Sequence, residues 1–122
     1  MNGVRLIQTF WNWLRELGHA NEPELRSQRL LRDWLSADQR AQYAKYGHFE
    51  VVGCHSGRRF RISRGIASNI VELDDNGHPI FGWCFIPRDT LVSGDVMLAQ
   101  KIALETDELG ALKIARNFAP RW

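Results

Sequence analysis

Four arginines near the middle of the chain form its most distinctive group of functional side chains, and they are Arg58, Arg59, Arg61 and Arg64. Arg59 and Arg61 fall on one face of an alternating, strand-like pattern. Guanidinium groups bind phosphates well, so this strand is a candidate site for nucleic acid or another phosphate ligand. The opposing prediction is a solvated face on which acids of the flanking strands neutralise the arginines, and these acids are Glu50, Glu72, Asp74 and Asp75.

The cysteines and histidines supply the second candidate chemistry. Cys54 is followed directly by His55, and Cys84 lies in a strongly apolar run. Adjacent residues of a strand point to opposite faces, and no Cys-x2-Cys pair is present, so we predict no metal site and leave a chemical role for Cys54 and His55 open. Cys84 is predicted to be a small buried apolar residue. The sequence contains no known catalytic or nucleotide-binding motif, which favours a non-enzymatic protein without a cofactor.

Aromatic residues close to the N-terminus form the third candidate site. Phe10, Trp11 and Trp13 surround most of a helix expected within residues 1–20, which is more than one core face requires. Such side chains are effective interface anchors, so the segment is predicted either to complete the core or to form a homodimer or partner interface. A membrane-surface helix is the weaker alternative, because Arg5 and Arg15 are its only arginines or lysines.

Length and composition indicate a single globular domain over residues 1–122. The chain is 44% hydrophobic and 25% charged, with a formal net charge of +2. These values exclude a disordered charged tail, and two cysteines are too few for a disulfide scaffold. The sequence has no signal-peptide core and no run of about 20 apolar residues, so we expect a cytoplasmic protein that does not enter a membrane.

The elements that must position these residues begin with helices. Residues 21–47 are predicted to be helical, with an apolar face formed by Leu31, Trp34 and Leu35. Asn21 with Glu24, and Ser36 with Gln39, have the spacing of capping boxes, and Gly47 is expected to end the last of these helices.

Residues 48–87 are predicted to form an antiparallel meander of about four strands. Phe49 and Val51 alternate with Glu50 and Val52. After a turn, Phe60 and Ile62 alternate with polar residues. A third strand is expected from about Ser68, and the Asp75-Asn76-Gly77 sequence predicts a tight hairpin into a strand over residues 80–86 that ends at Pro87.

Residues 93–118 are predicted to form a C-terminal helix packed across the sheet, which gives an α+β fold. Ser93 or Asp95 is expected to cap a helix that begins near Val96. A kink or break is expected at Thr106-Asp107 or at Gly110. The predicted core face consists of Leu98, Ile102, Leu109 and Leu112, with Met97 and Leu104 at its flanks.

Several segments share a pattern with a known group of proteins. They are Phe49-Glu50-Val51, residues 56–62, Asn69-Ile70 with Leu73, Cys84, Pro87 and residues 94–101, together with the helix that ends at Gly47. In these segments the chain resembles a family of small proteins from proteobacteria and their phages. The resemblance implies neither an activity nor a site. From the residues, we expect a small interaction or adaptor module that self-associates, with phosphate or nucleic-acid binding through the arginine strand as the alternative.

Overall fold

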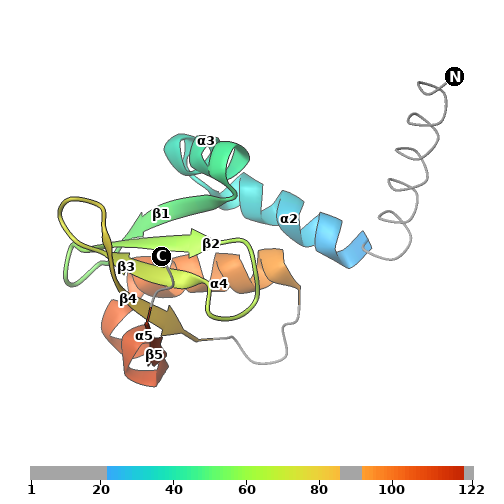
Figure 1. The fold of residues 1–122 in the computed structure, drawn as a ribbon. Coiled ribbons are helices and arrows are strands. Elements are labelled where there is room, and N and C mark those ends of the chain that lie inside the picture. The colour runs from blue at the N-terminus through green and yellow to red at the C-terminus, as the bar shows by residue number, and fades with distance from the viewer. Residues whose placement is uncertain (1–21, 86–91, 120–122) are drawn as a thin grey trace, which may run out of the picture.

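The computed structural model describes residues 22–85 and 92–119. This part of the chain is an α+β fold, as the sequence predicts, with four helices and one five-stranded antiparallel sheet in the order β1-β2-β3-β4-β5 (Figure 1). The helices are α2 (Glu22–Trp34), α3 (Ala37–Tyr46), α4 (Ser93–Thr106) and α5 (Glu108–Ile114). The strands are β1 (His48–Val52), β2 (Arg59–Ser63), β3 (Ile70–Leu73), β4 (Pro79–Cys84) and β5 (Arg116–Phe118).

The sequence signals at the ends of α3 are confirmed. The backbone N–H of Gln39 donates to Ser36 Oγ at 3.2 Å. The side-chain oxygen of Gln39 accepts from the backbone N–H of Ser36 at 3.0 Å, which completes the capping box. Gly47 ends the helix with a φ of 75°, a conformation that glycine adopts without strain. Asn21, the other predicted cap, lies outside the described residues.

The first three strands follow the predicted meander. Phe49 lies opposite Ile62, and Val51 lies opposite Phe60, so the alternating apolar residues of β1 and β2 share one face. The third strand begins at Ile70, slightly later than expected, and the predicted tight turn leads from it to β4, with Gly77 at a φ of 82°. The last strand, β5, was not foreseen. Its residues were expected to be helical, but they pair with β4.

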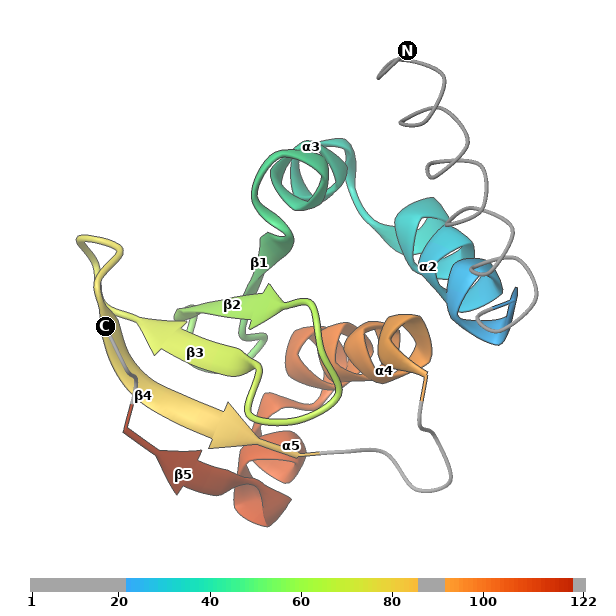
Figure 2. The same cartoon turned by 45° about the vertical axis from the view of Figure 1, so that its right-hand side comes forward.

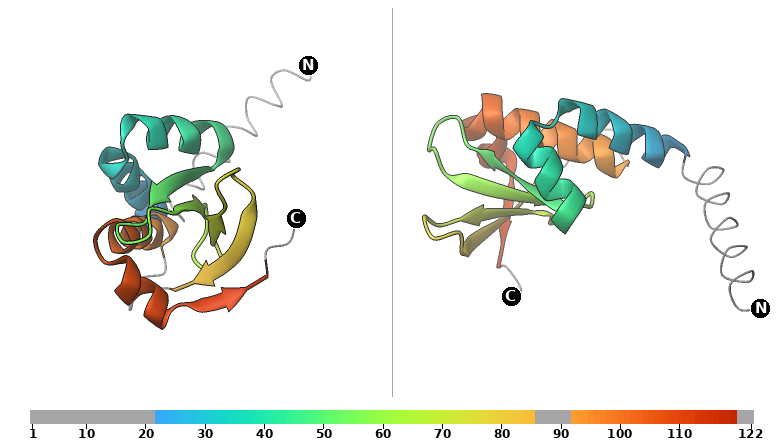
Figure 3. Two further views of the ribbon diagram at one scale, coloured as in Figure 1. Left: turned by 90° about the vertical axis from the view of Figure 1, so that its left-hand side faces the viewer. Right: turned by 90° about the horizontal axis from the view of Figure 1, so that it is seen from above.

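The sheet is curved, with α4 and α5 against its inner side (Figures 2 and 3). Gly82 of β4 permits the close approach of β5, because a Cβ atom there would lie 2.3 Å from the ring of Phe118. The strand β4 ends at Cys84, and Phe85 follows it into the core. Pro87 and residues 88–91 of the predicted connection to α4 lie outside the described residues.

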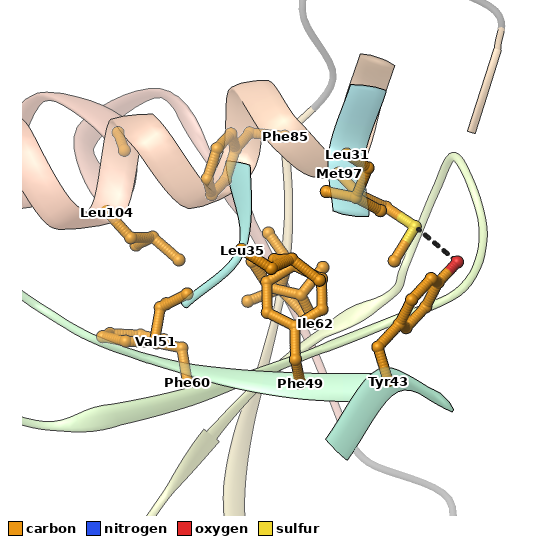
Figure 4. Close-up of a cluster of buried hydrophobic side chains, with 12 residues drawn as sticks. Leu31, Leu35, Tyr43, Phe49, Val51, Phe60, Ile62, Phe85, Met97 and Leu104 are labelled. Atoms are coloured by element: carbon orange, nitrogen blue, oxygen red, sulfur yellow. Dashed lines mark hydrogen bonds between the residues drawn. The ribbon is translucent and has the colours of Figure 1, made fainter. Parts of the chain in front are cut away.

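The main core lies between this inner face of the sheet and the helices (Figure 4). Its fully buried side chains include Phe49, Phe60 and Ile62 from the strands and Leu31 and Met97 from the helices. All four residues of β3 are buried, which is typical of a strand covered on both faces. The arginine strand, β2, is hydrogen-bonded to one edge of this central strand, and β4 is hydrogen-bonded to the other.

The predicted core face of the C-terminal helix is wrong in part. Met97 and Leu104 are fully buried, whereas Ile102 and Leu109 are 44% and 59% exposed. The side of α4 that faces the sheet also carries Gln100, which is fully buried and exchanges hydrogen bonds with Asn69 at 2.9 and 3.0 Å. A buried glutamine with satisfied partners cannot be distinguished from a solvent-facing one by hydrophobic periodicity, which explains the shifted prediction.

The start of α4 also differs from the prediction. The helix begins at Ser93, and its N-cap, Val92, has no side chain that can cap it. The Glu24 carboxylate accepts from the Ser93 backbone amide at 3.1 Å instead. Ser93 is buried and donates its hydroxyl to Glu24 of α2, while Asp95 lies exposed in the first turn. The predicted break at Asp107 is confirmed, since Asp107 ends α4 and caps α5 through a hydrogen bond from Gly110 N.

A close helix–helix contact fixes α2 beside α4, as both views of Figure 3 show. A Cβ atom at Gly94 would lie 2.3 Å from the backbone carbon of Ser27, so only glycine allows the two helices to approach this closely. Beside this contact, Gln28 donates to Ser93 Oγ at 2.7 Å and accepts from the Tyr43 hydroxyl at 2.5 Å. These buried hydrogen bonds hold α2, α3 and α4 in a single arrangement.

Candidate functional site

The structure divides the four arginines between separate environments. Arg58 pairs with the buried carboxylate of Glu72 at 2.9 Å, and Arg59 pairs with Glu50 at 3.1 Å. Glu72 also accepts a hydrogen bond from Trp83 Nε1 at 3.0 Å, so its charge is held in place. Two of the four guanidinium groups are therefore neutralised by the flanking strands, as the opposing prediction from the sequence requires.

Arg61 shares the face of Arg59 but forms no ion pair within the described residues. Its buried Nε atom has no hydrogen-bond partner there, and neither has Nδ1 of His48 on β1. Burial and the nearby positive charge of Arg61 lower the pKa of His48, which favours the neutral imidazole. Arg64 follows β2, and its backbone amide donates to Gly47 O at 3.0 Å. In the described part of the chain, Arg58 and Arg59 therefore have acidic partners, whereas Arg61 has none.

Cys54 and His55 lie in the turn that follows β1, not on a strand as expected. This turn surrounds the buried carboxylate of Glu108, which accepts from His55 N at 2.9 Å, from Ser56 N at 2.8 Å and from Ser56 Oγ at 2.6 Å. Burial opposes ionisation of Glu108, but the hydrogen bonds from Ser56 and His55 outweigh it and lower its pKa. The turn thus anchors α5 to the β1–β2 hairpin.

The sulfur atoms of both cysteines accept hydrogen bonds from backbone amides. Cys54 is exposed, and its Sγ accepts from Glu108 N at 3.4 Å. Cys84 is only partly buried, contrary to the prediction, and its Sγ accepts from Ser68 N at 3.3 Å. Within residues 22–85 and 92–119, no group of three or more His, Cys, Asp or Glu side chains is arranged to hold a metal ion.

The outer edge of β1 is closed by α3. Gln39 Nε2 donates to the carbonyl oxygen of Glu50 at 3.0 Å, and Gln42 Oε1 accepts from the Glu50 amide at 2.9 Å. Two glutamine side chains thus satisfy both backbone groups of Glu50, in the middle of this edge. An incoming strand would have to displace them to pair with Glu50.

An unexpected apolar surface runs along the α2–α4 pair. Trp34 is 61% exposed and Leu30 is 45% exposed, although Trp34 was predicted to belong to the buried face of its helix. Leu30 and Trp34 follow Ser27 at intervals of three and seven residues, so they share the side of α2 that borders the Ser27–Gly94 contact. On α4, Leu98 and Ile102 follow Gly94 at intervals of four and eight residues.

These four residues, Leu30, Trp34, Leu98 and Ile102, are called the α2–α4 strip below. Leu98 is half-buried, while the other three are exposed. The strip lies on the outer side of the helix pair, because the opposite sides carry Gln28 and Met97 toward the core. Sequence periodicity placed Trp34 and Ile102 in the core, and only the position of the Ser27–Gly94 contact shows that they face outward.

The predicted interface residues Phe10, Trp11 and Trp13 lie outside the described part of the chain, so their role stays a prediction. None of the described helices is long and apolar enough to cross a membrane. The chain matches no protein-family model, no curated protein and no solved structure.

Proposed function

We propose that this protein is a non-enzymatic interaction module that self-associates, and that the α2–α4 strip is part of its contact surface. The observation that carries the proposal is the exposure of Trp34, Leu30 and Ile102 on two helices that pack against each other. Tryptophan is enriched among the residues that dominate binding energy at interfaces, and exposed apolar surfaces between helices commonly bind the apolar face of another helix.

The rigidity of the helix pair supports this function. Ser27 and Gly94 hold the two backbones in close contact, and hydrogen bonds among Glu24, Gln28 and Ser93 fix the helices at the end where the strip begins. A preformed surface loses little conformational entropy when a partner binds. Binding to the strip therefore requires no rearrangement of the core.

Binding of nucleic acid or phosphate through the arginine strand has weaker support. Glu72 and Glu50 already neutralise Arg58 and Arg59, and the formal net charge of the whole chain is only +2. Nucleic-acid domains carry a more basic balance than this. The two functions differ in their response to salt, because phosphate binding weakens steeply as salt rises, whereas apolar association does not.

The test is the mass of the protein in solution, measured by light scattering over a range of concentrations. We expect a species of about twice the 14.1 kDa chain mass that persists in high salt. Trp34→Gln should reduce the association, whereas Leu109→Gln should not, although Leu109 on α5 is equally exposed at 59%. A strict monomer at high concentration, or an equal effect of the two substitutions, contradicts the proposal.

A further inference from the structure

Exposed apolar side chains on a helix pair can bind the apolar face of another helix, and a segment of this chain has the residue pattern of such a face. Val4, Ile7, Trp11 and Leu14 recur at the spacing of one helix face, in the segment that directly precedes α2. This rests on the self-association proposed above. We propose that residues 4–17 of one copy bind as a helix to the α2–α4 strip of a second copy, so that two chains exchange their N-terminal segments.

The length of the segment fits the strip. Fourteen helical residues span about 21 Å, and α2, with 13 residues, spans about 20 Å. Four residues, 18–21, separate the segment from the start of α2 at Glu22. The segment can therefore lie alongside a complete α2 helix and contact both Leu30 and Trp34.

The second apolar face of the segment favours binding between two copies. Phe10 and Trp13, with Leu6 and Leu17, lie on a face adjacent to that of Trp11. The strip can cover only one of these faces. A closed dimer contains two copies of the segment, so the second faces of the two copies are assigned to each other.

A mixing experiment with full-length chains tests the exchange. One variant, Trp11→Gln, has a weakened segment and an intact strip, and the other, Trp34→Gln, has an intact segment and a weakened strip. Each variant alone should lose at least tenfold in dimer affinity. An equimolar mixture should regain a dimer of intermediate affinity, because the intact segment of one variant can bind the intact strip of the other. Each variant measured alone at the total protein concentration of the mixture serves as the control.

The possible outcomes separate this inference from the proposed function. Recovery of the dimer on mixing supports the exchange. If both variants are monomeric and their mixture forms no dimer, residues 4–17 of one copy do not bind the α2–α4 strip of another, and the proposed exchange is wrong. If the wild type is dimeric and neither substitution weakens it, the protein self-associates through another surface and the exchange is overturned. If the wild type is a monomer, both proposals fail. Far-ultraviolet circular dichroism of each variant establishes that it is folded.

Discussion

Replacing Glu108 by glutamine should destabilise the protein in a pH-dependent way. Glu108 is 2% exposed, and its carboxylate accepts three hydrogen bonds from the turn after β1, two of them from Ser56 and one from His55. The substitution keeps the size of the side chain but removes its charge. It also places an amide group where the Ser56 hydroxyl now donates.

The expected loss follows from these contacts. A hydrogen bond to a charged group contributes about 1.5–3 kcal/mol, and a neutral one contributes about 1 kcal/mol. In Glu108→Gln the side-chain oxygen still accepts from the two backbone amides, but the contact with Ser56 Oγ is weakened. We therefore expect the free energy of unfolding to fall by about 1–2 kcal/mol. Glu108→Ala removes all three bonds. Because His55 and Ser56 are exposed and water can replace part of the interaction, its expected loss is about 2–3 kcal/mol.

The free energy of unfolding measured by urea titration between pH 7 and pH 3 provides the assay. The lowered pKa of Glu108 means that the unfolded chain takes up its proton first as the pH falls. The stabilisation by Glu108 is therefore complete above its ordinary pKa of 4.5 and is lost as the pH falls through the lower folded-state value. The difference between wild type and Glu108→Gln should shrink over that interval.

A control substitution separates this effect from the loss of any surface charge. Glu22 pairs with Arg26 at 2.7 Å, but both side chains are more than half exposed, so Glu22→Gln should change stability by less than about 0.5 kcal/mol. Acid sensitivity will persist in Glu108→Gln, because Glu24 and Asp74 also have lowered pKa values. Equal stability of Glu108→Gln, Glu108→Ala and wild type at pH 7 would refute the role assigned to this carboxylate.

Two other substitutions test the helix contacts. Gly94→Ala should cost about 1–3 kcal/mol in thermal or urea unfolding, because the added Cβ meets the Ser27 backbone at 2.3 Å and α2 must move; unchanged stability would show that the helices are farther apart. Ser36→Ala should cost about 1 kcal/mol through loss of the capping box, whereas Asp95→Ala should cost at most about 0.5 kcal/mol, since Asp95 is an exposed first-turn residue and not the cap. Equal losses for these two variants would contradict the observed N-caps.

Much of the architecture could be predicted because its signals are local. Ser36 and Gln39 are three residues apart, and the hydrogen bonds of the capping box need nothing beyond that turn of chain. The alternation around Phe60 and the positive φ at Gly77 are equally local. Local chemistry of this kind determined α3, the first two strands and the tight turn before β4, and it indicated that α4 would end near Asp107.

The candidate contact surface could not be predicted in the same way. Trp34 and Ile102 satisfy the helical periodicity of core residues, yet both are exposed. Gln100 breaks that periodicity, yet it is fully buried because Asn69, 31 positions away in sequence, satisfies its side chain. Each of α2 and α4 has more than one side that could be buried. Which side is buried depends on the side chains that the other helices and strands place against it.

The sequence by itself determined the fold class, the turn and cap positions and the acids available to the arginine strand. Only the tertiary structure decided that Glu72 and Glu50 bind Arg58 and Arg59, that residues 116–118 form a strand against Gly82, and that α2 and α4 cross at Ser27 and Gly94. The physical reason is how far apart in sequence the interacting residues are. Caps and turns are set by neighbours a few residues away, whereas burial and ion pairing are set by distant segments that meet only when the core closes.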